Sequence, residues 1–96
     1  MKYHKENCID ASEKDKEGNH EYYYEYTLYS FENEGVTLVA RSYRDAYEEV
    51  CFLNKSFLGE ISFFKKEDEN TEFVKNAISV LKRDEHKKVI RFLFEE

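Results

Sequence analysis

The sequence contains no proline and no tryptophan, and it has only three glycines and two cysteines among 96 residues. Without proline, X-Pro isomerisation cannot slow folding, and no proline-rich linker divides the chain. The glycines Gly18, Gly35 and Gly59 are isolated, which excludes the GxGxxG and P-loop nucleotide-binding motifs. The cysteines Cys8 and Cys51 are too few for the disulfide framework of a small secreted scaffold and lack CxxC spacing, so we expect two reduced thiols.

Long apolar runs are also missing. No segment approaches the roughly 20 apolar residues of a membrane-spanning helix, and residues 1–10 lack the apolar stretch of a secretory signal. The histidines His4, His20 and His86 have no metal-ligand spacing, and no serine lies in a GxSxG elbow. We therefore expect a cytoplasmic protein without a membrane partner, metal ion, cofactor or recognisable catalytic residues.

The charge of the chain is acidic and unevenly distributed. The net charge is −6, and residues 21–35 contain four glutamates and neither Lys nor Arg. Such a balance disfavours binding to nucleic acids or anionic membranes, and it suits a basic protein partner. The basic residues near the C-terminus are interpreted as ordinary solvated charge; they are Lys82, Arg83, Lys87, Lys88 and Arg91.

The first half of the chain predicts a polar segment followed by a hairpin. Residues 1–20 are mostly polar and can contribute little to a core, so we expect a polar mobile arm or loop. Residues 21–32 alternate as a strand does, and the turn chemistry of residues 33–35 joins them to a β-branched strand at 36–41.

The second half predicts further strands around one helix. The stretch 42–54 fits either a helix or a turn at 44–46 followed by a strand, and the short apolar run at its end favours turn plus strand. Another strand is expected at 61–64. Helical spacing of apolar residues, acids at the start and bases at the end predict a helix at 71–83. The apolar segment 89–94 reads as a central strand.

These elements predict an α+β fold with two layers. The sheet is mainly antiparallel, has about five strands and carries the helix 71–83 on one face. The connection through that helix could place two strands parallel. A chain of this length fits one domain, expected at residues 21–96.

Five of the eight tyrosines lie between residues 22 and 29, interleaved with acids. If the helix covers the other face of this strand, Tyr23, Glu25 and Tyr29 form an exposed acidic and aromatic surface, with Glu32 and Glu34 at the hairpin tip. Tyrosine is enriched in protein interfaces, and carboxylates steer a basic partner. We therefore expect a small acidic protein-binding module, an inhibitor or antidote of the immunity type that covers a basic toxin or nuclease surface.

Three alternatives stay open. The tyrosines can simply cover the sheet without a binding role, because tyrosine is a good strand former. The chain can be a homodimeric structural or assembly subunit that buries the tyrosine strand against a second copy. It can also be a small enzyme whose site has no sequence signature.

Overall fold

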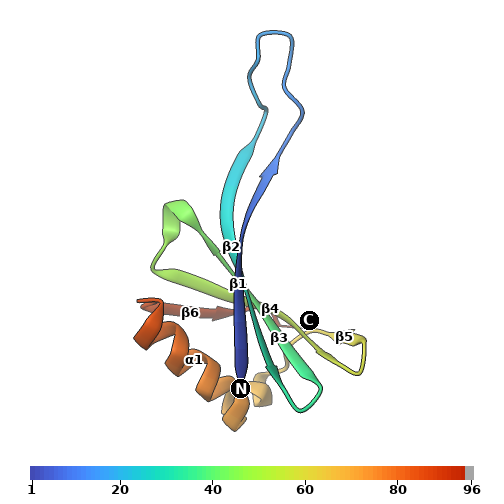
Figure 1. Ribbon diagram of the computed structural model, residues 1–96, viewed down its shortest axis with the longest axis vertical. Helices are drawn as coiled ribbons and strands as arrows, with labels where there is room; N and C mark the ends of the chain where they lie inside the picture. Colours follow the sequence, from blue (N-terminus) through green and yellow to red (C-terminus); the bar gives the residue numbers. More distant parts are fainter. Residues whose placement is uncertain (95–96) are drawn as a thin grey trace.

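The computed structural model describes residues 1–94; residues 95 and 96, at the end of the expected 21–96 domain, lie outside the described part. Residues 1–94 form a mixed α+β fold with a six-stranded, mainly antiparallel sheet and one α-helix (Figure 1). The predicted fold class is thus confirmed. The strands are β1 (Lys2–Ala11), β2 (Tyr23–Asn33), β3 (Val36–Tyr43), β4 (Glu49–Phe57), β5 (Glu60–Ser62) and β6 (Val89–Phe92), and the helices are η1 (Arg44–Ala46), η2 (Lys66–Asn70) and α1 (Glu72–Asp84).

The strands β1 to β5 follow one another across the sheet in chain order, each antiparallel to the next. β6 pairs parallel with β4, beside residues 49–52, whereas β5 pairs with residues 55–57 of β4. β5 and β6 therefore lie end to end along the same side of β4. The expectation of a central position for the last strand was wrong, because β4 is its only partner strand among the described residues.

The N-terminal segment departs most from the sequence analysis. Residues 2–11, which were expected to be part of a loop, form β1 and pair with β2 from Lys2↔Glu32 to Ala11↔Tyr23. The polar composition does not prevent pairing, because backbone hydrogen bonds to a neighbouring strand need no apolar side chains. The two strands extend beyond the rest of the sheet as a long hairpin, and the molecule measures 50 × 29 × 26 Å (Figure 1).

The other connections agree with the sequence analysis. Glu34 and Gly35 join β2 to β3 with φ angles of 50° and 83°, and this pair of positive angles is typical of a two-residue hairpin turn. The ambiguous segment 42–54 contains the short helix η1 and then β4, so the interpretation as turn plus strand is confirmed. The helix predicted at 71–83 is α1, which begins and ends one residue later.

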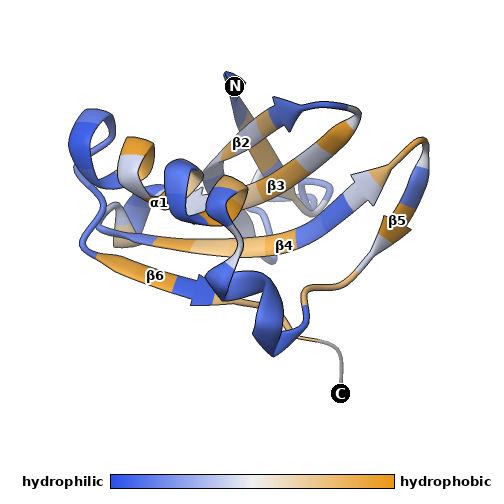
Figure 2. Ribbon diagram, turned by 90° about the horizontal axis from the view of Figure 1, so that it is seen from below, coloured by the Kyte–Doolittle hydropathy of each residue, from blue (hydrophilic) through white to orange (hydrophobic). Residues whose placement is uncertain are grey.

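The helix packs on one face of the sheet (Figure 2). This packing fixes which side chains of β2 are buried. The core contains Val74, Ala77 and Leu81 from α1, together with aromatic side chains from the strands. Phe52 lies at its centre, with its ring centroid 6.3 Å from Phe31, 5.7 Å from Phe64 and 5.0 Å from Phe92. The odd-numbered residues of β2 face the helix, since Tyr29 and Phe31 belong to this core. Within the described residues, no helix combines the length and apolar character that crossing a membrane requires.

Candidate functional site

The structure buries one of the five residues predicted to form a binding surface. Tyr29 is only 2% exposed and belongs to the core under α1. The face of β2 that carries Tyr23, Glu25 and Tyr29 is the face that the helix covers, so the expected exposure of Tyr29 was wrong. Burial, with a smaller contribution from the nearby Glu85 carboxylate, raises the pKa of the Tyr29 phenol to about 12.

Tyr23 and Glu25 lie on the same face, farther along β2. The Tyr23 hydroxyl donates a hydrogen bond of 3.0 Å to Oε1 of Glu25, and Nη1 of Arg44 forms an ion pair with Oε2 of the same carboxylate. The hydrogen bond from Arg44, followed by that from Tyr23, lowers the pKa of Glu25. Tyr23 is exposed, but Glu25 already has a cation as partner.

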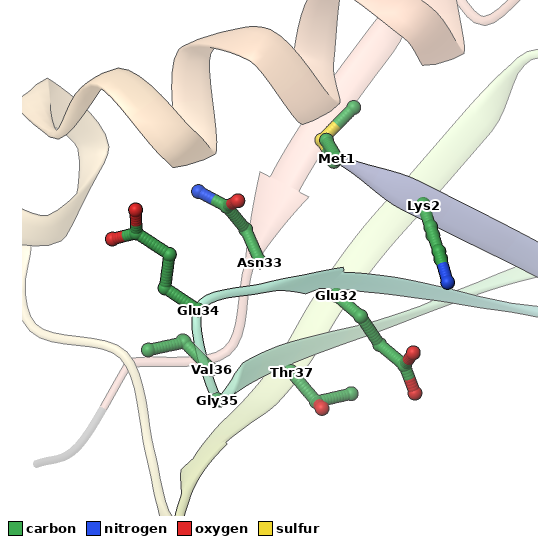
Figure 3. Close-up of a pocket in the computed structure, with 8 residues that line it drawn as sticks. All are labelled: Met1, Lys2, Glu32, Asn33, Glu34, Gly35, Val36 and Thr37. Atoms are coloured by element: carbon green, nitrogen blue, oxygen red, sulfur yellow. The ribbon is translucent and has the colours of Figure 1, made fainter.

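Glu32 lies at the opposite end of β2, and Glu34 lies in the turn that follows this strand. Glu32 is seven positions after Glu25, which corresponds to about 23 Å along a strand. Both glutamates line a hollow of about 450 Å³ at the β2–β3 turn (Figure 3). Figure 3 shows Glu34 and Asn33 pointing toward the helix side and Glu32 pointing the other way, together with Lys2, its partner in the β1–β2 register. The five predicted residues therefore do not form one continuous surface.

The structure instead gathers exposed tyrosines and acids on the far part of the β1–β2 hairpin. We call residues 10–25 the acidic arm. It contains six carboxylates and two lysines, a net charge of −4 out of the chain's −6. Tyr22, Tyr23 and Tyr24 lie at its base and are 45%, 48% and 50% exposed. The arm thus combines acidic and aromatic character at the end of the molecule farthest from the helix (Figure 1).

Local hydrogen bonds organise the arm. The carboxylate of Asp15 accepts hydrogen bonds of 2.9 Å from the backbone N–H groups of Glu17 and Asn19. The hydroxyl oxygen of Ser12 accepts from the N–H groups of Glu21 and Tyr22 at 2.6 and 3.1 Å. Side-chain oxygens that accept hydrogen bonds from backbone N–H groups are typical of defined turns. The polar residues at the tip therefore define a folded turn.

A row of aromatic rings runs from the arm onto the sheet face that points away from α1, which we call the open face. The ring centroids of Tyr22 and Tyr24 are 6.1 Å apart, and Tyr43 lies 5.8 Å from Tyr24 and 5.9 Å from Tyr26. The guanidinium of Arg41 lies 4.7 Å from the centre of the Tyr43 ring. Such contacts hold the rings in fixed positions and reduce the entropy that a partner must remove on binding.

A buried cluster of polar groups lies beyond the C-terminal end of α1. Lys87, expected to be a solvated charge, is 2% exposed. Its amine donates hydrogen bonds of 2.9 Å to the Ser42 hydroxyl and 2.5 Å to the Tyr47 carbonyl, and it lies 3.6 Å from the centre of the Tyr47 ring. Burial lowers the pKa of Lys87. No local pattern distinguishes this lysine from the exposed lysines around it, because its partners come from 40 and 45 residues away.

Ser42 and Tyr47 also line a hollow of about 460 Å³ beside Glu25 and Arg44. A serine hydroxyl next to a buried amine is one arrangement that can generate a nucleophile. Here the Ser42 hydroxyl donates its proton to the backbone carbonyl of Glu49 at 2.7 Å, and the Lys87 amine is satisfied by acceptors from two elements. The geometry therefore favours a role in joining β3 to the segments that follow η1 and α1 over a role in catalysis.

No group of three or more metal-binding side chains occurs within residues 1–94. The acidic arm, with its three exposed tyrosines, is the candidate functional site that the geometry favours most. Searches for similar proteins found that no family model, no curated protein and no solved structure matches the chain.

Proposed function

We propose that the protein is a small binding module whose acidic arm enters a basic cleft of a partner protein. The partner class is the one expected from the sequence: an enzyme such as a toxin or nuclease, whose cationic surface the module covers as an inhibitor or antidote. The observation that carries the proposal is the concentration of −4 of the net charge and three half-exposed tyrosines on a projecting hairpin.

The shape of the arm favours a cleft over a flat surface. Successive side chains of a strand point to opposite faces, so Tyr23 lies on one face of the arm and Tyr22 and Tyr24 lie on the other. A flat partner would contact one of these faces and leave the other in water. A cleft can bury rings on both faces, and buried tyrosines are among the residues that contribute most to interface affinity.

The charge of the arm favours a basic partner. Glu25 is neutralised by Arg44, but no ion pair within 4.0 Å involves the carboxylates of Glu13, Glu17 and Glu21 in the described part of the chain. Unneutralised carboxylates at the end of an elongated molecule reach an approaching cation before the rest of the surface does. Electrostatic steering of this kind raises association rates by about 10- to 1,000-fold.

A capture experiment tests the proposal. The wild-type protein, immobilised through its C-terminus, is expected to retain a basic protein from a lysate of its own host cells. The double variant Tyr22→Ser, Tyr24→Ser should lose that protein, because truncating each central tyrosine costs more than about 1 kcal/mol of binding free energy.

The matched control changes two exposed apolar side chains that lie far from the arm, Phe57→Ser and Leu58→Ser, and it should retain the same protein. Circular dichroism of both variants checks that they fold. Retention by the arm variant, or equal loss with both variants, would rule out the arm as the binding element.

A further inference from the structure

The open face carries an exposed apolar strip along the edge formed by β5 and β6, distant from the acidic arm. The strip consists of Ile61, Phe63, Leu93 and Val89, with Arg91 between the last two. Their exposed fractions are 74%, 51%, 48% and 40%. A row of large apolar side chains in water, interrupted only by Arg91, is unfavourable for a monomer, and patches of this kind mark interaction sites.

Strand register places the four side chains on one face. Ile61 lies opposite Ser56, which lies opposite Thr37, so these residues point to the same side of the sheet. Thr37 follows Val36 and precedes Leu38, which both pack into the core, and it therefore points to the open face.

The orientation of the side chains in and after β6 follows from the alternation of side chains along a strand. Ile90, Phe92 and Phe94 pack against the core, which directs Val89, Arg91 and Leu93 to the open face. Phe64 is fully buried and bridges to Phe94 in parallel, which brings Phe63 and Leu93 next to each other on the open side. The β5 and β6 parts of the strip therefore meet at the junction between the two strands.

Charge makes the strip suitable for a second copy of the same chain. Its one charged member, Arg91, is paired with Glu49, with 2.8 Å between Nε and Oε1. Two strips can therefore meet without bringing unpaired like charges together, although each chain has a net charge of −6. The acidic arm extends from the β1–β2 side of the sheet, so it stays outside a contact made along the β5–β6 side.

The exposed area is also sufficient for a pair of copies. With about 150–200 Å² for each fully exposed large side chain, the four exposed fractions correspond to roughly 320–430 Å² per copy. Two copies would bury roughly 750 Å² of apolar surface. Because about 60% of an interface is apolar, the whole contact would cover about 1,200 Å², which is the lower limit for specific interfaces.

We infer that the protein forms a symmetric homodimer in which the β5–β6 strips of two copies pack face to face. The two sheets lie about 10 Å apart, as in sheet-on-sheet packing. The interface differs from a dimer that buries the tyrosine strand, because both arms remain free. The inference does not depend on the proposed capture of a basic partner.

Sedimentation equilibrium at increasing micromolar concentrations tests the dimer. The wild-type protein should show a dimer, and the variant Phe63→Lys should be monomeric at the same concentrations because it places a like charge on both sides of the contact. The more conservative variant Ile61→Thr should weaken association at least about fivefold, which provides a second test if Phe63→Lys fails to fold.

The matched control is Tyr24→Lys, which introduces the same charge at a position of similar exposure on the arm and should remain dimeric. A monomeric wild-type protein would overturn the inference, as would a dimer that survives both strip variants. A monomer that sediments with phosphatidylcholine vesicles would show that lipid, and not a second copy, covers the strip. The arm variants of the capture experiment leave the strip intact, so the two proposals can fail independently.

Discussion

Alkaline titration can measure whether the hydroxyl of Tyr29 is buried. The structure buries this residue, which the sequence predicts to lie on an exposed binding surface. Burial raises the pKa of Tyr29 from 10.0 to about 12. A phenol whose pKa is higher in the folded state contributes stability that is fully present below the unfolded pKa. This contribution is lost as the pH rises toward the folded pKa.

The magnitude follows from the size of the shift. Two pKa units correspond to about 2.7 kcal/mol in total, and the loss reaches about 1.4 kcal/mol near pH 11, midway between the two pKa values. The variant Tyr29→Phe keeps the ring in the core but cannot ionise. The wild-type protein should therefore lose about 1.4 kcal/mol more free energy of unfolding than the variant when the pH rises from neutral to about pH 11.

Urea unfolding of both proteins at the two pH values measures this difference, and all other titrating groups cancel in the comparison. The difference in tyrosinate absorbance between the two proteins should have its midpoint near 12 while the fold persists. A midpoint near 10, with no change in relative stability, would show that Tyr29 is in contact with water and would refute the placement of β2 against α1.

Three further predictions concern stability. Phe52→Ala should lower the free energy of unfolding by about 3–5 kcal/mol because it empties the centre of the core, whereas the exposed Phe57→Ala should change it by less than about 1 kcal/mol; chemical denaturation compares the two. Leu58→Asn should raise the melting temperature, because Leu58 has a φ of 50° that asparagine tolerates better, and Glu34→Asn at the equivalent position of the other hairpin should act in the same direction. Lys87→Met should remove a pH dependence of stability. Because the pKa of Lys87 is lowered in the folded state, the wild-type free energy of unfolding should rise as the pH approaches 10.5. Urea titrations should show that the variant lacks this rise and is less stable relative to the wild type at alkaline pH than at neutral pH.

The elements that the sequence predicted well are those whose apolar spacing has one clear period. In α1, the buried positions Val74, Ala77 and Leu81 recur at helical intervals, and the acids and bases at its two ends agree with the helix dipole. The turn at Glu34 and Gly35 followed from turn chemistry alone. Local patterns of this kind decide secondary structure because they act within a few residues.

The orientation of β2 could not follow from such a pattern. Both faces of this strand are apolar: one carries Tyr22, Tyr24 and Tyr26, and the other carries Tyr29 and Phe31. Alternation identifies a strand but does not say which face the helix covers when the two faces are equally apolar. Only the packing of α1 decides that Tyr29 is buried and that the Tyr22 face is open.

Long-range contacts explain the remaining differences. β1 has a polar sequence and becomes a strand because β2 supplies a partner along its whole length. Lys87 is buried because Ser42 and Tyr47 offer acceptors that lie far from it in the sequence. The arm was missed because residues 1–20 were expected to be a mobile arm or loop, and only the pairing of β1 with β2 turns the contiguous segment 10–25 into a projecting hairpin.

The association rate constant of the captured partner, measured at low and high salt, tests the central proposal most directly. Neutralising Glu13, Glu17 and Glu21 to glutamine should slow association at low salt by about tenfold or more, and salt should reduce the difference from wild type. The matched change of Glu32, Glu34 and Glu60 removes the same charge at the other end of the sheet and should alter the rate much less. Equal rate constants for the two triple variants would contradict the account, because they would show that the arm does not guide the partner.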